Sequence, residues 1–177
     1  MRLALTKRAG DAIRILLHLA TLPEGTRMSS TKIAEASGVS HGNIPTLIAA
    51  LSRAELLDCT RGPGGGCALS RDAEEITVAE TVIAIEGALE PERCAIDDRR
   101  CIERDYNCGI HDTWRGVIHE MQQRLANLSI AEAQRRATAR EDEYASRSAA
   151  REAGQRGELS IGVGVPVREV TRISSYD

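Results

Sequence analysis

Residues 29–70 constrain the fold of this chain most strongly, because they combine a helix–glycine–helix pattern with a glycine-rich hairpin. A serine precedes the first short helix and Gly38 follows it, and these residue types are preferred at the two ends of a helix. Two short helices joined by a turn of three or four residues that contains glycine are typical of a helix-turn-helix. The apolar positions at helical spacing are Ile33, Ala34, Ile44, Leu47, Ile48 and Leu51.

The hairpin that follows predicts a wing. Residues 56–60 and 67–70 read as two short strands, and the loop R-G-P-G-G-G at 61–66 joins them. This loop lacks the Gly-Lys-Ser/Thr ending of a nucleotide-binding loop and does not open a helix, which argues against nucleotide phosphates. Cys59 and Cys67 are interpreted as small buried apolar residues of the strands. We therefore predict a mainly α fold with a winged helix-turn-helix domain.

The polar residues of this region predict double-stranded DNA as a partner. Hydroxyl and amide side chains at the start of the second helix can bond base edges in the major groove. Gly-rich backbone beside one arginine at the wing tip suits a close approach to the minor groove. Helix capping is the competing interpretation for Ser40 and Asn43. The candidate DNA-binding residues are Ser40, His41, Asn43, Thr46, Arg61 and Gly62.

The distribution of charge agrees with this assignment. The net charge of the chain is −3, but residues 1–72 carry nine Lys/Arg against six Asp/Glu. Residues 73–111 carry four against ten, and residues 112–177 carry ten of each. An anionic partner should therefore meet the N-terminal part, where Lys7 and Lys32 are further candidates for phosphate contacts.

Cysteines in a polar stretch predict a metal centre. Six residues separate Cys94 from Cys101 and six separate Cys101 from Cys108, and His111 follows after two more. Thiolates and imidazole are ligands that iron–sulfur clusters and zinc select. The alternative is that these are ordinary cysteines of a charged loop, but free cysteine prefers burial. The candidate metal ligands are Cys94, Cys101, Cys108 and His111.

The remaining composition limits the class of protein. The chain has five cysteines, an odd number, and its start has no export signal, so we expect reduced thiols and a cytoplasmic protein. No apolar run reaches the ~18 residues of a membrane span. The sequence has no Cys-x-x-Cys and no evident nucleophile–base pair, so we do not expect an enzyme; a thiol enzyme is the least favoured alternative.

Helical patterns flank the cysteine stretch. Residues 5–20 predict a first amphipathic helix, and the capping boxes at 77–80 and 129–132 each open a later one. The expected organisation is a winged-helix domain at 1–90, a cluster-binding loop at 91–111, a dimerisation helix with a short C-terminal helix at 112–140, and a tail at 141–177. For the start of the tail the alternative is a continued polar helix, and for residues 158–177 the alternatives are pairing with a sheet edge and a mobile tail. The apolar stripe of the dimerisation helix is Trp114, Val117, Ile118, Met121, Leu125 and Leu128.

Together these segments resemble the Rrf2 family of bacterial transcription regulators, over roughly residues 1–135. The motifs that carry the resemblance are M-R-L at the start, L-S-R-A-E-L-L after the second helix, R-G-P-G-G-G in the wing and C-G-I-H-D-T-W after the cysteines. The resemblance implies a homodimer built on a long helix at about 111–127. It also implies a redox, nitric oxide or iron–sulfur sensor whose [2Fe–2S] cluster is held by Cys94, Cys101, Cys108 and His111.

The chain departs from the family pattern in two ways. Both intervals between the cysteines are one residue longer than usual, and Pro45 falls inside the expected recognition helix. Either Asn43 is the true cap and this helix starts late, or its first turn is distorted. Other members hold a [4Fe–4S] cluster with an acidic residue of the partner subunit, and here Asp11 lies one position from that place, which Gly10 occupies. A structural zinc site of three cysteines and one histidine is the remaining alternative.

Overall fold

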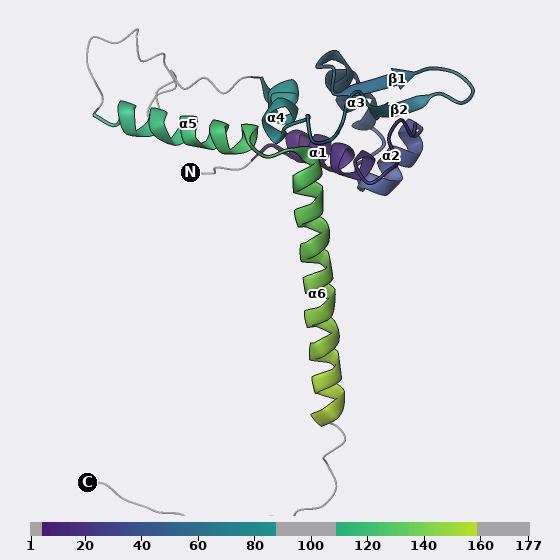
Figure 1. Ribbon diagram of the computed structural model, residues 1–177, viewed down its shortest axis with the longest axis vertical. Helices are drawn as coiled ribbons and strands as arrows, with labels where there is room; N and C mark the ends of the chain where they lie inside the picture. Colours follow the sequence, from purple (N-terminus) through teal and green to yellow (C-terminus); the bar gives the residue numbers. More distant parts are fainter. Residues whose placement is uncertain (1–4, 88–108, 159–177) are drawn as a thin grey trace, which may run out of the picture. The chain divides into compact units, whose positions relative to one another are not determined.

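The computed structural model describes residues 5–87 and 109–158, with side chains up to 148 and at 151 (Figure 1). The chain divides into two compact units, residues 1–137 and 138–177. The elements are α1 (Lys7–Leu19), α2 (Ser30–Ser37), α3 (Ile44–Arg53), β1 (Leu57–Thr60), β2 (Gly66–Leu69), α4 (Val78–Glu86), α5 (His111–Ala126) and α6 (Ile130–Glu158). The predicted mainly α, winged helix-turn-helix fold is confirmed.

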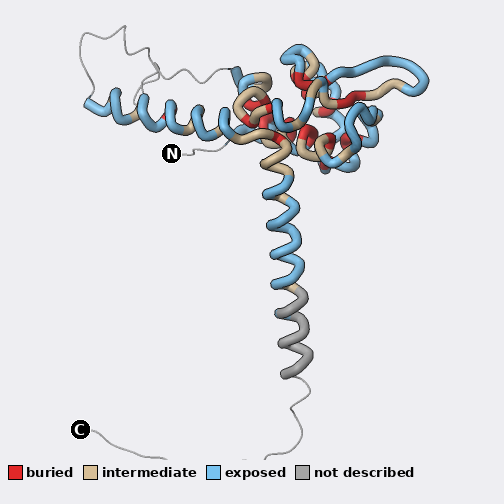
Figure 2. The backbone as a smooth tube through the Cα atoms, in the orientation of Figure 1, coloured by how far each residue is buried: buried red, intermediate tan, exposed pale blue. Residues whose placement is uncertain are grey.

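The core of the first unit is one apolar cluster to which α1–α4, the wing and the start of α6 all contribute. Figure 2 shows the buried positions gathered in these elements. Each helix buries one stripe of apolar side chains, as its periodicity predicts. The largest side chains below 2% exposure in this core are Ile15, Leu16, Ile33, Ile44, Leu47, Leu51, Leu56, Ile76 and Ile130.

The first helix of the helix-turn-helix forms as the sequence predicts. Ser29 caps α2 by accepting a hydrogen bond from the Lys32 backbone N–H, at 3.4 Å. Gly38 ends the helix with a φ of 65°, a left-handed conformation that glycine adopts without steric cost. Val39, the next residue, is buried and plugs the turn into the core.

The second helix, α3, starts later than a cap at Ser40 would allow. The Asn43 backbone N–H donates to the Ser40 carbonyl oxygen at 2.9 Å, which makes residues 40–43 a turn. Asn43 occupies the cap position, although its side chain makes no capping hydrogen bond. Pro45 therefore falls in the first turn, where no intrahelical N–H donor is required. Of the two interpretations of Pro45, the late start is correct, and Ser40 is not a helix cap.

The two capping boxes behave differently. At α4, the Thr77 and Glu80 side chains each accept from the other residue's backbone N–H, at 3.1 and 2.8 Å. Burial raises the pKa of Glu80, but hydrogen bonds from Thr77 and the charge of Arg71 outweigh it, so this pKa is below its ordinary value. At α6, Ser129 caps the Glu132 N–H at 3.1 Å. The Glu132 carboxylate instead accepts from arginines further along the helix.

The last helix is longer than the short element that we expected, because α6 continues for 29 residues to Glu158. Its first turn joins the core through the Ile130 N–H, which donates to the Ile76 carbonyl oxygen at 2.7 Å. Arg135 also donates to Glu74, and this hydrogen bond lowers the pKa of that carboxyl. Among the described helices, none combines the length and apolar character that a membrane crossing requires.

Candidate nucleic-acid interface

The start of α3 presents most of the polar residues that the sequence singles out. Ser40, His41 and Thr46 are exposed, and Asn43 is half-buried. The opposite side of the helix is fixed in the core, because Ile44, Leu47 and Leu51 are at most 2% exposed. The apolar stripe thus holds α3 rigidly while the polar side chains face solvent. The four predicted residues therefore belong to one continuous segment of the helix-turn-helix.

The wing tip owes its shape to its glycines. Arg61 and Gly62 are exposed at the tip, and the Gly65 N–H donates to the Gly62 carbonyl oxygen at 2.9 Å. Gly62 and Gly64 have φ values of 102° and 77°, which side-chain-bearing residues rarely adopt. A Cβ on Gly65 would lie 2.3 Å from the Thr60 carbonyl oxygen. The glycine run is thus required to close the hairpin tightly behind Arg61.

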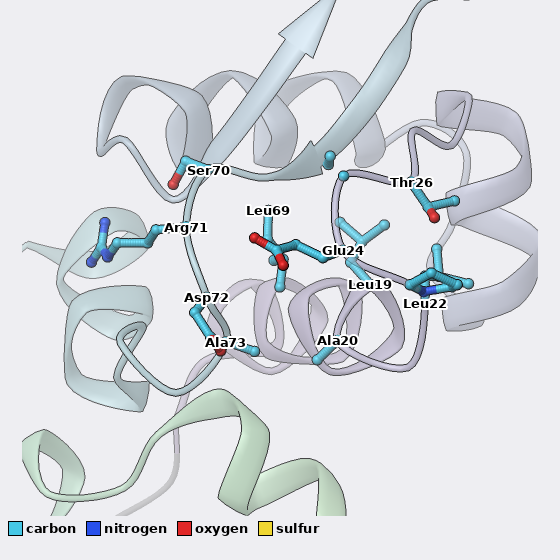
Figure 3. Close-up of a pocket in the computed structure, with 13 residues that line it drawn as sticks. Leu19, Ala20, Leu22, Glu24, Thr26, Leu69, Ser70, Arg71, Asp72 and Ala73 are labelled. Carbon is cyan, nitrogen blue, oxygen red and sulfur yellow. The ribbon is translucent and has the colours of Figure 1, made fainter.

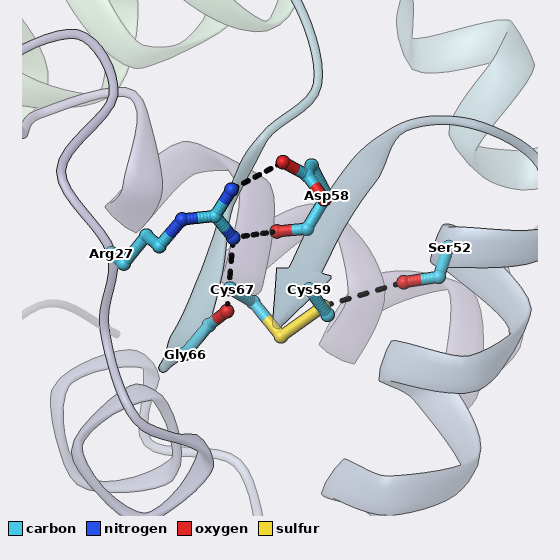
Figure 4. The surroundings of a disulfide bond; sticks show 6 residues. All are labelled: Arg27, Ser52, Asp58, Cys59, Gly66 and Cys67. Atoms are coloured by element: carbon cyan, nitrogen blue, oxygen red, sulfur yellow. Dashed lines mark hydrogen bonds and ion pairs between the residues drawn. A yellow bond between two sulfur atoms is a disulfide. The ribbon is translucent and has the colours of Figure 1, made fainter. Parts of the chain in front are cut away.

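A third segment, which sequence reasoning missed, supports the base of the wing. Met28 forms an antiparallel bridge with Cys67, in which each backbone N–H donates to the other residue's carbonyl oxygen at 2.9 Å. Beside it, Arg27 donates to the carbonyl oxygens of Asp58 and Gly66, at 3.1 and 3.3 Å, and forms an ion pair with the Asp58 carboxylate (Figure 4). Arg27 therefore links both strands of the hairpin to the segment that enters α2.

The wing cysteines correct one expectation. Cys59 and Cys67 are directly opposite in the register of β1 and β2, and a disulfide bond joins them. Cys67 is buried at 6% exposure, as expected, but Cys59 is exposed. The prediction that all thiols are reduced, with both wing cysteines acting as buried apolar residues, is thus wrong for this pair. The reason is the strand register, which brings their Cα atoms to 4.1 Å.

A pocket of about 340 Å³ lies between the α1–α2 connection and the segment after β2 (Figure 3). Its apolar lining includes Leu19, Leu22 and Leu69, and its rim carries the carboxylates of Glu24 and Asp72. The one cation among its lining residues, Arg71, donates to Glu80 at 2.6 Å and to the Glu55 carbonyl oxygen at 3.1 Å. The acidic rim makes this pocket unsuited to DNA phosphates.

The predicted metal ligands are only partly within the described residues. His111 is the first residue of α5 and is half-buried, while Cys94, Cys101 and Cys108 lie outside the described residues. Within residues 5–87 and 109–158, no group of three or more metal-ligating side chains comes together. The rival ligand Asp11 is 1% exposed, and one of its carboxylate oxygens accepts a hydrogen bond from Arg14 on the same helix.

The apolar stripe of α5 is divided between the core and the surface. Ile118 is buried within the chain at 7% exposure, whereas Val117 is 45% exposed. Leu125 and Leu128 pack against the core cluster. The exposed part of the stripe, which includes Val117 and the half-buried Trp114 and Met121, remains available for a partner.

The sequence matches the Rrf2 family, described as iron-dependent transcriptional regulators, over residues 5–136. The chain therefore belongs to the Rrf2 family, as its motifs predict. It is 33% identical over 128 residues to a helix-turn-helix transcriptional regulator of Azotobacter vinelandii, ORF2. It is 29% identical over 128 residues to the regulator IscR of Photorhabdus laumondii. Each alignment covers 72% of this chain and 77% of the relative.

Solved structures share the fold. The global cysteine regulator CymR of B. subtilis superposes with a TM-score of 0.63 at 18% identity, covering 75% of this chain and 97% of that one. IscR of T. potens superposes with a TM-score of 0.61 at 24% identity, covering 76% and 88%. At these identities the likeness concerns the fold, and it agrees with the winged helix described above.

The close contact at Gly65 gives a first test of the wing. We expect Gly65→Ala to lower the free energy of unfolding by roughly 1–3 kcal/mol, because the added methyl group would displace backbone atoms. Gly42→Ala is the matched control, since a Cβ at this position would have no atom within 4 Å and the φ of Gly42 lies outside the left-handed region that disfavours alanine. Urea denaturation of both variants measures the difference. Equal stabilities would contradict the tight closure of the hairpin.

Proposed function

We propose that this Rrf2-family protein is a homodimeric transcription regulator that binds operator DNA and senses redox, nitric oxide or iron–sulfur status through a [2Fe–2S] cluster. One observation supports DNA binding: the polar start of α3 and Arg61 are both exposed, while the elements that carry them are fixed. The apolar core fixes α3, and the Met28–Cys67 bridge fixes the wing. Such a regulator acts where the genome is, so the cytoplasm is its proposed location.

The DNA-binding residues act at two grooves in this proposal. Ser40, His41, Asn43 and Thr46 contact base edges in the major groove through hydroxyl, imidazole and amide groups. Capping does not compete for the Asn43 side chain, since it makes no capping bond. Arg61 enters the minor groove, with Gly62 allowing the backbone to approach the sugar-phosphate chain closely.

The cluster is proposed to be held by Cys94, Cys101, Cys108 and His111. The chemistry of the donor set fits, because three thiolates and one imidazole suit an iron–sulfur centre, which would supply one-electron chemistry when bound. His111 stands at the N-terminal end of α5, a helix end that favours negative charge such as that of thiolate ligands. His111 is half-buried, so the residue keeps some exposure to solvent.

The environment of Asp11 favours His111 as the fourth ligand. To ligate iron in a partner subunit, the Asp11 carboxylate would have to leave its buried position and its bond to Arg14. The Arg14 side chain is 51% exposed and the Asp11 side chain is 2% exposed, so the cost of this move is the loss of the hydrogen bond and of the packing around Asp11. A [4Fe–4S] cluster with an acidic ligand across the dimer is therefore the second candidate, and a structural zinc site in the same loop is the third.

The dimer is proposed to form along the exposed part of the α5 stripe. Val117 is 45% exposed on α5, and Ile110, which immediately precedes this helix, is also 45% exposed. Because Ile118 is buried within one chain, it contributes to the stability of the subunit itself. The residues that a partner would cover are thus the exposed members of the stripe rather than the buried ones.

Arg61→Ala tests the wing. We expect weaker binding to operator DNA with unchanged iron content. If Arg61 contacts only a phosphate, the loss should be equal on all sequences and the salt slope should fall by about one; if it reads the minor groove, the loss on the operator should be about 1–3 kcal/mol. Fluorescence anisotropy titrations at several salt concentrations measure both. Arg140→Ala removes the same charge from α6 and serves as control, and equal affinities for the two variants would exclude a wing contact.

His111→Ala tests the fourth ligand. We expect anaerobically reconstituted His111→Ala to hold less iron and sulfide and to have an altered absorption spectrum, while Asp11→Asn stays close to the parent. Asparagine keeps the shape of the buried side chain and removes its charge. The opposite pattern would replace the proposal with a cross-dimer [4Fe–4S] site. A colourless parent protein that contains zinc and no labile sulfide would favour the structural zinc site.

Val117→Asp tests the dimer. A carboxylate at the centre of an apolar interface would be desolvated without a partner, which costs several kcal/mol. We expect light scattering to give the mass of a monomer, with a circular dichroism spectrum like that of the parent. Gln123→Asp, exposed and facing away from the stripe, is the control and should remain dimeric. A dimeric Val117→Asp protein would show that the interface lies elsewhere.

A further inference from the structure

We propose that the Cys59–Cys67 pair is a reversible thiol–disulfide exchange site in the wing, which reacts with low-molecular-weight thiols and disulfides and so regulates DNA binding. The regulatory part rests on the proposed function, because it requires the wing to contact DNA. The site is separate in sequence from the cysteine stretch proposed for the cluster. It would give the protein a second redox input, located inside the DNA-binding domain.

The backbone pairing creates this site. Both the N–H and the C=O of Cys67 bond Met28, so they point away from β1. Cys59 and Cys67 must therefore be a pair without mutual backbone hydrogen bonds, the kind in which opposite residues of antiparallel strands approach most closely. Their Cα separation of 4.1 Å agrees with this geometry. The two sulfur atoms are thus brought together by strand pairing, while Arg27 bonds both strands through Asp58 and Gly66 (Figure 4).

Access to the two sulfurs is unequal. Cys59 is exposed, whereas Cys67 is 6% exposed and belongs to the core cluster. Thiol–disulfide exchange needs an attacking thiolate to reach one sulfur in line with the bond. An incoming thiol therefore attacks the sulfur of Cys59, and Cys67 is the leaving group. This asymmetry distinguishes the pair from a disulfide that is buried on both sides.

Reduction takes two balanced steps. A thiolate RS⁻ attacks the Cys59 sulfur, a mixed disulfide Cys59–S–S–R forms, and Cys67 leaves as a thiolate that takes a proton. A second RS⁻ attacks the sulfur of R, which releases RSSR and the Cys59 thiolate. The Ser52 hydroxyl donates a hydrogen bond to the Cys59 sulfur at 3.3 Å, and a donor in this position stabilises the departing Cys59 thiolate. Oxidation by RSSR is the reverse, so two electrons pass between the pair and RSSR.

The disulfide closes the wing loop, and the hydrogen bond from Ser52 to Cys59 links the wing to α3. Ser52 lies near the end of α3, and Cys59 and Cys67 bracket the loop that carries Arg61. With the bond closed, the ends of this loop are fixed before DNA is met, so less conformational freedom is lost on binding. With the bond open, the hairpin keeps its backbone hydrogen bonds, its Arg27 contacts and its apolar packing, but it loses the covalent link between the two ends of the loop. The oxidised protein should therefore bind DNA more tightly than the reduced one.

The proposed cytoplasmic location of this regulator bears on the role of the Cys59–Cys67 pair. Disulfides are rare where glutathione keeps thiols reduced, and those that form there are usually transient and redox-sensing. A pair with one exposed sulfur can exchange with the glutathione pool, so its state would follow the ratio of glutathione to its disulfide. The wing pair is thus better interpreted as a switch than as a permanent cross-link.

The exchange itself is tested without DNA. The full-length protein is equilibrated anaerobically in glutathione buffers of increasing oxidised fraction, and free thiols are trapped by alkylation. Peptide mass spectrometry then reads each cysteine separately. We expect Cys59 and Cys67 to lose alkylation together, with one midpoint. If they remain alkylated even in the most oxidising buffer, or resist reduction in the most reducing one, the exchange site is refuted.

The regulation is tested by DNA affinity in the same buffers. We expect the parent to bind operator DNA about three- to tenfold more tightly when the pair is oxidised. Cys59→Ser, at an exposed position, cannot form the bond but keeps the cysteines proposed for the cluster, so its affinity should be insensitive to this pair. A parent affinity that is equal in both states, or an equal response in Cys59→Ser, overturns the switch. If no redox form of the parent binds any DNA, the proposed function fails, whereas the alkylation result still decides the exchange site.

Discussion

The pairing of Met28 with Cys67 is the interaction on which the wing depends. A two-stranded hairpin is only marginally stable by itself, and these two hydrogen bonds add a third backbone segment to it. Met28 immediately precedes Ser29, the cap of α2, so the same bridge ties the wing to the helix-turn-helix. It also requires Gly66, because a Cβ there would lie 2.7 Å from the Met28 carbonyl oxygen. The wing is thus fixed by these backbone contacts together with the Arg27 side chain, which bonds both strands.

Features that depend on neighbouring residues were predictable from the sequence. The Ser29 cap, the stop at Gly38 and the box at Thr77 each involve groups within about four residues. The disulfide was not, because it depends on strand register. Strands ending at residue 60 and restarting at 67 would pair Cys59 with Ala68, whereas the actual register pairs Cys59 with Cys67. A shift of one residue decides whether the two sulfurs meet.

The length of α6 shows a different limit of pattern reading. The sequence predicts a short C-terminal helix within residues 112–140. The helix instead continues with charged residues four apart, such as Glu132 with Arg136 at 2.7 Å and Glu143 with Arg147 at 3.7 Å. Each pair of this kind contributes only ~0.2–0.5 kcal/mol to helix stability, so no single pair is a strong enough signal to predict the helix. Pattern reading based on apolar stripes overlooks a helix that is supported by many weak polar pairs.

The late start of α3 has a consequence for the proposed DNA contacts. Pro45 has no N–H to donate within a helix and fits the first turn, where none is required, so the chain turns at 40–43 and becomes helical at Ile44. Ser40 and His41 therefore stand on the turn, while Thr46 stands on the helix. In a helix that began at Ser40, the directions of these side chains would be fixed by the regular rotation of about 100° per residue. On a turn, Ser40 and His41 point in other directions relative to Thr46 than they would on a continuous helix. In the proposed DNA contacts, this changes which base edges these side chains reach, while the apolar core stays the same.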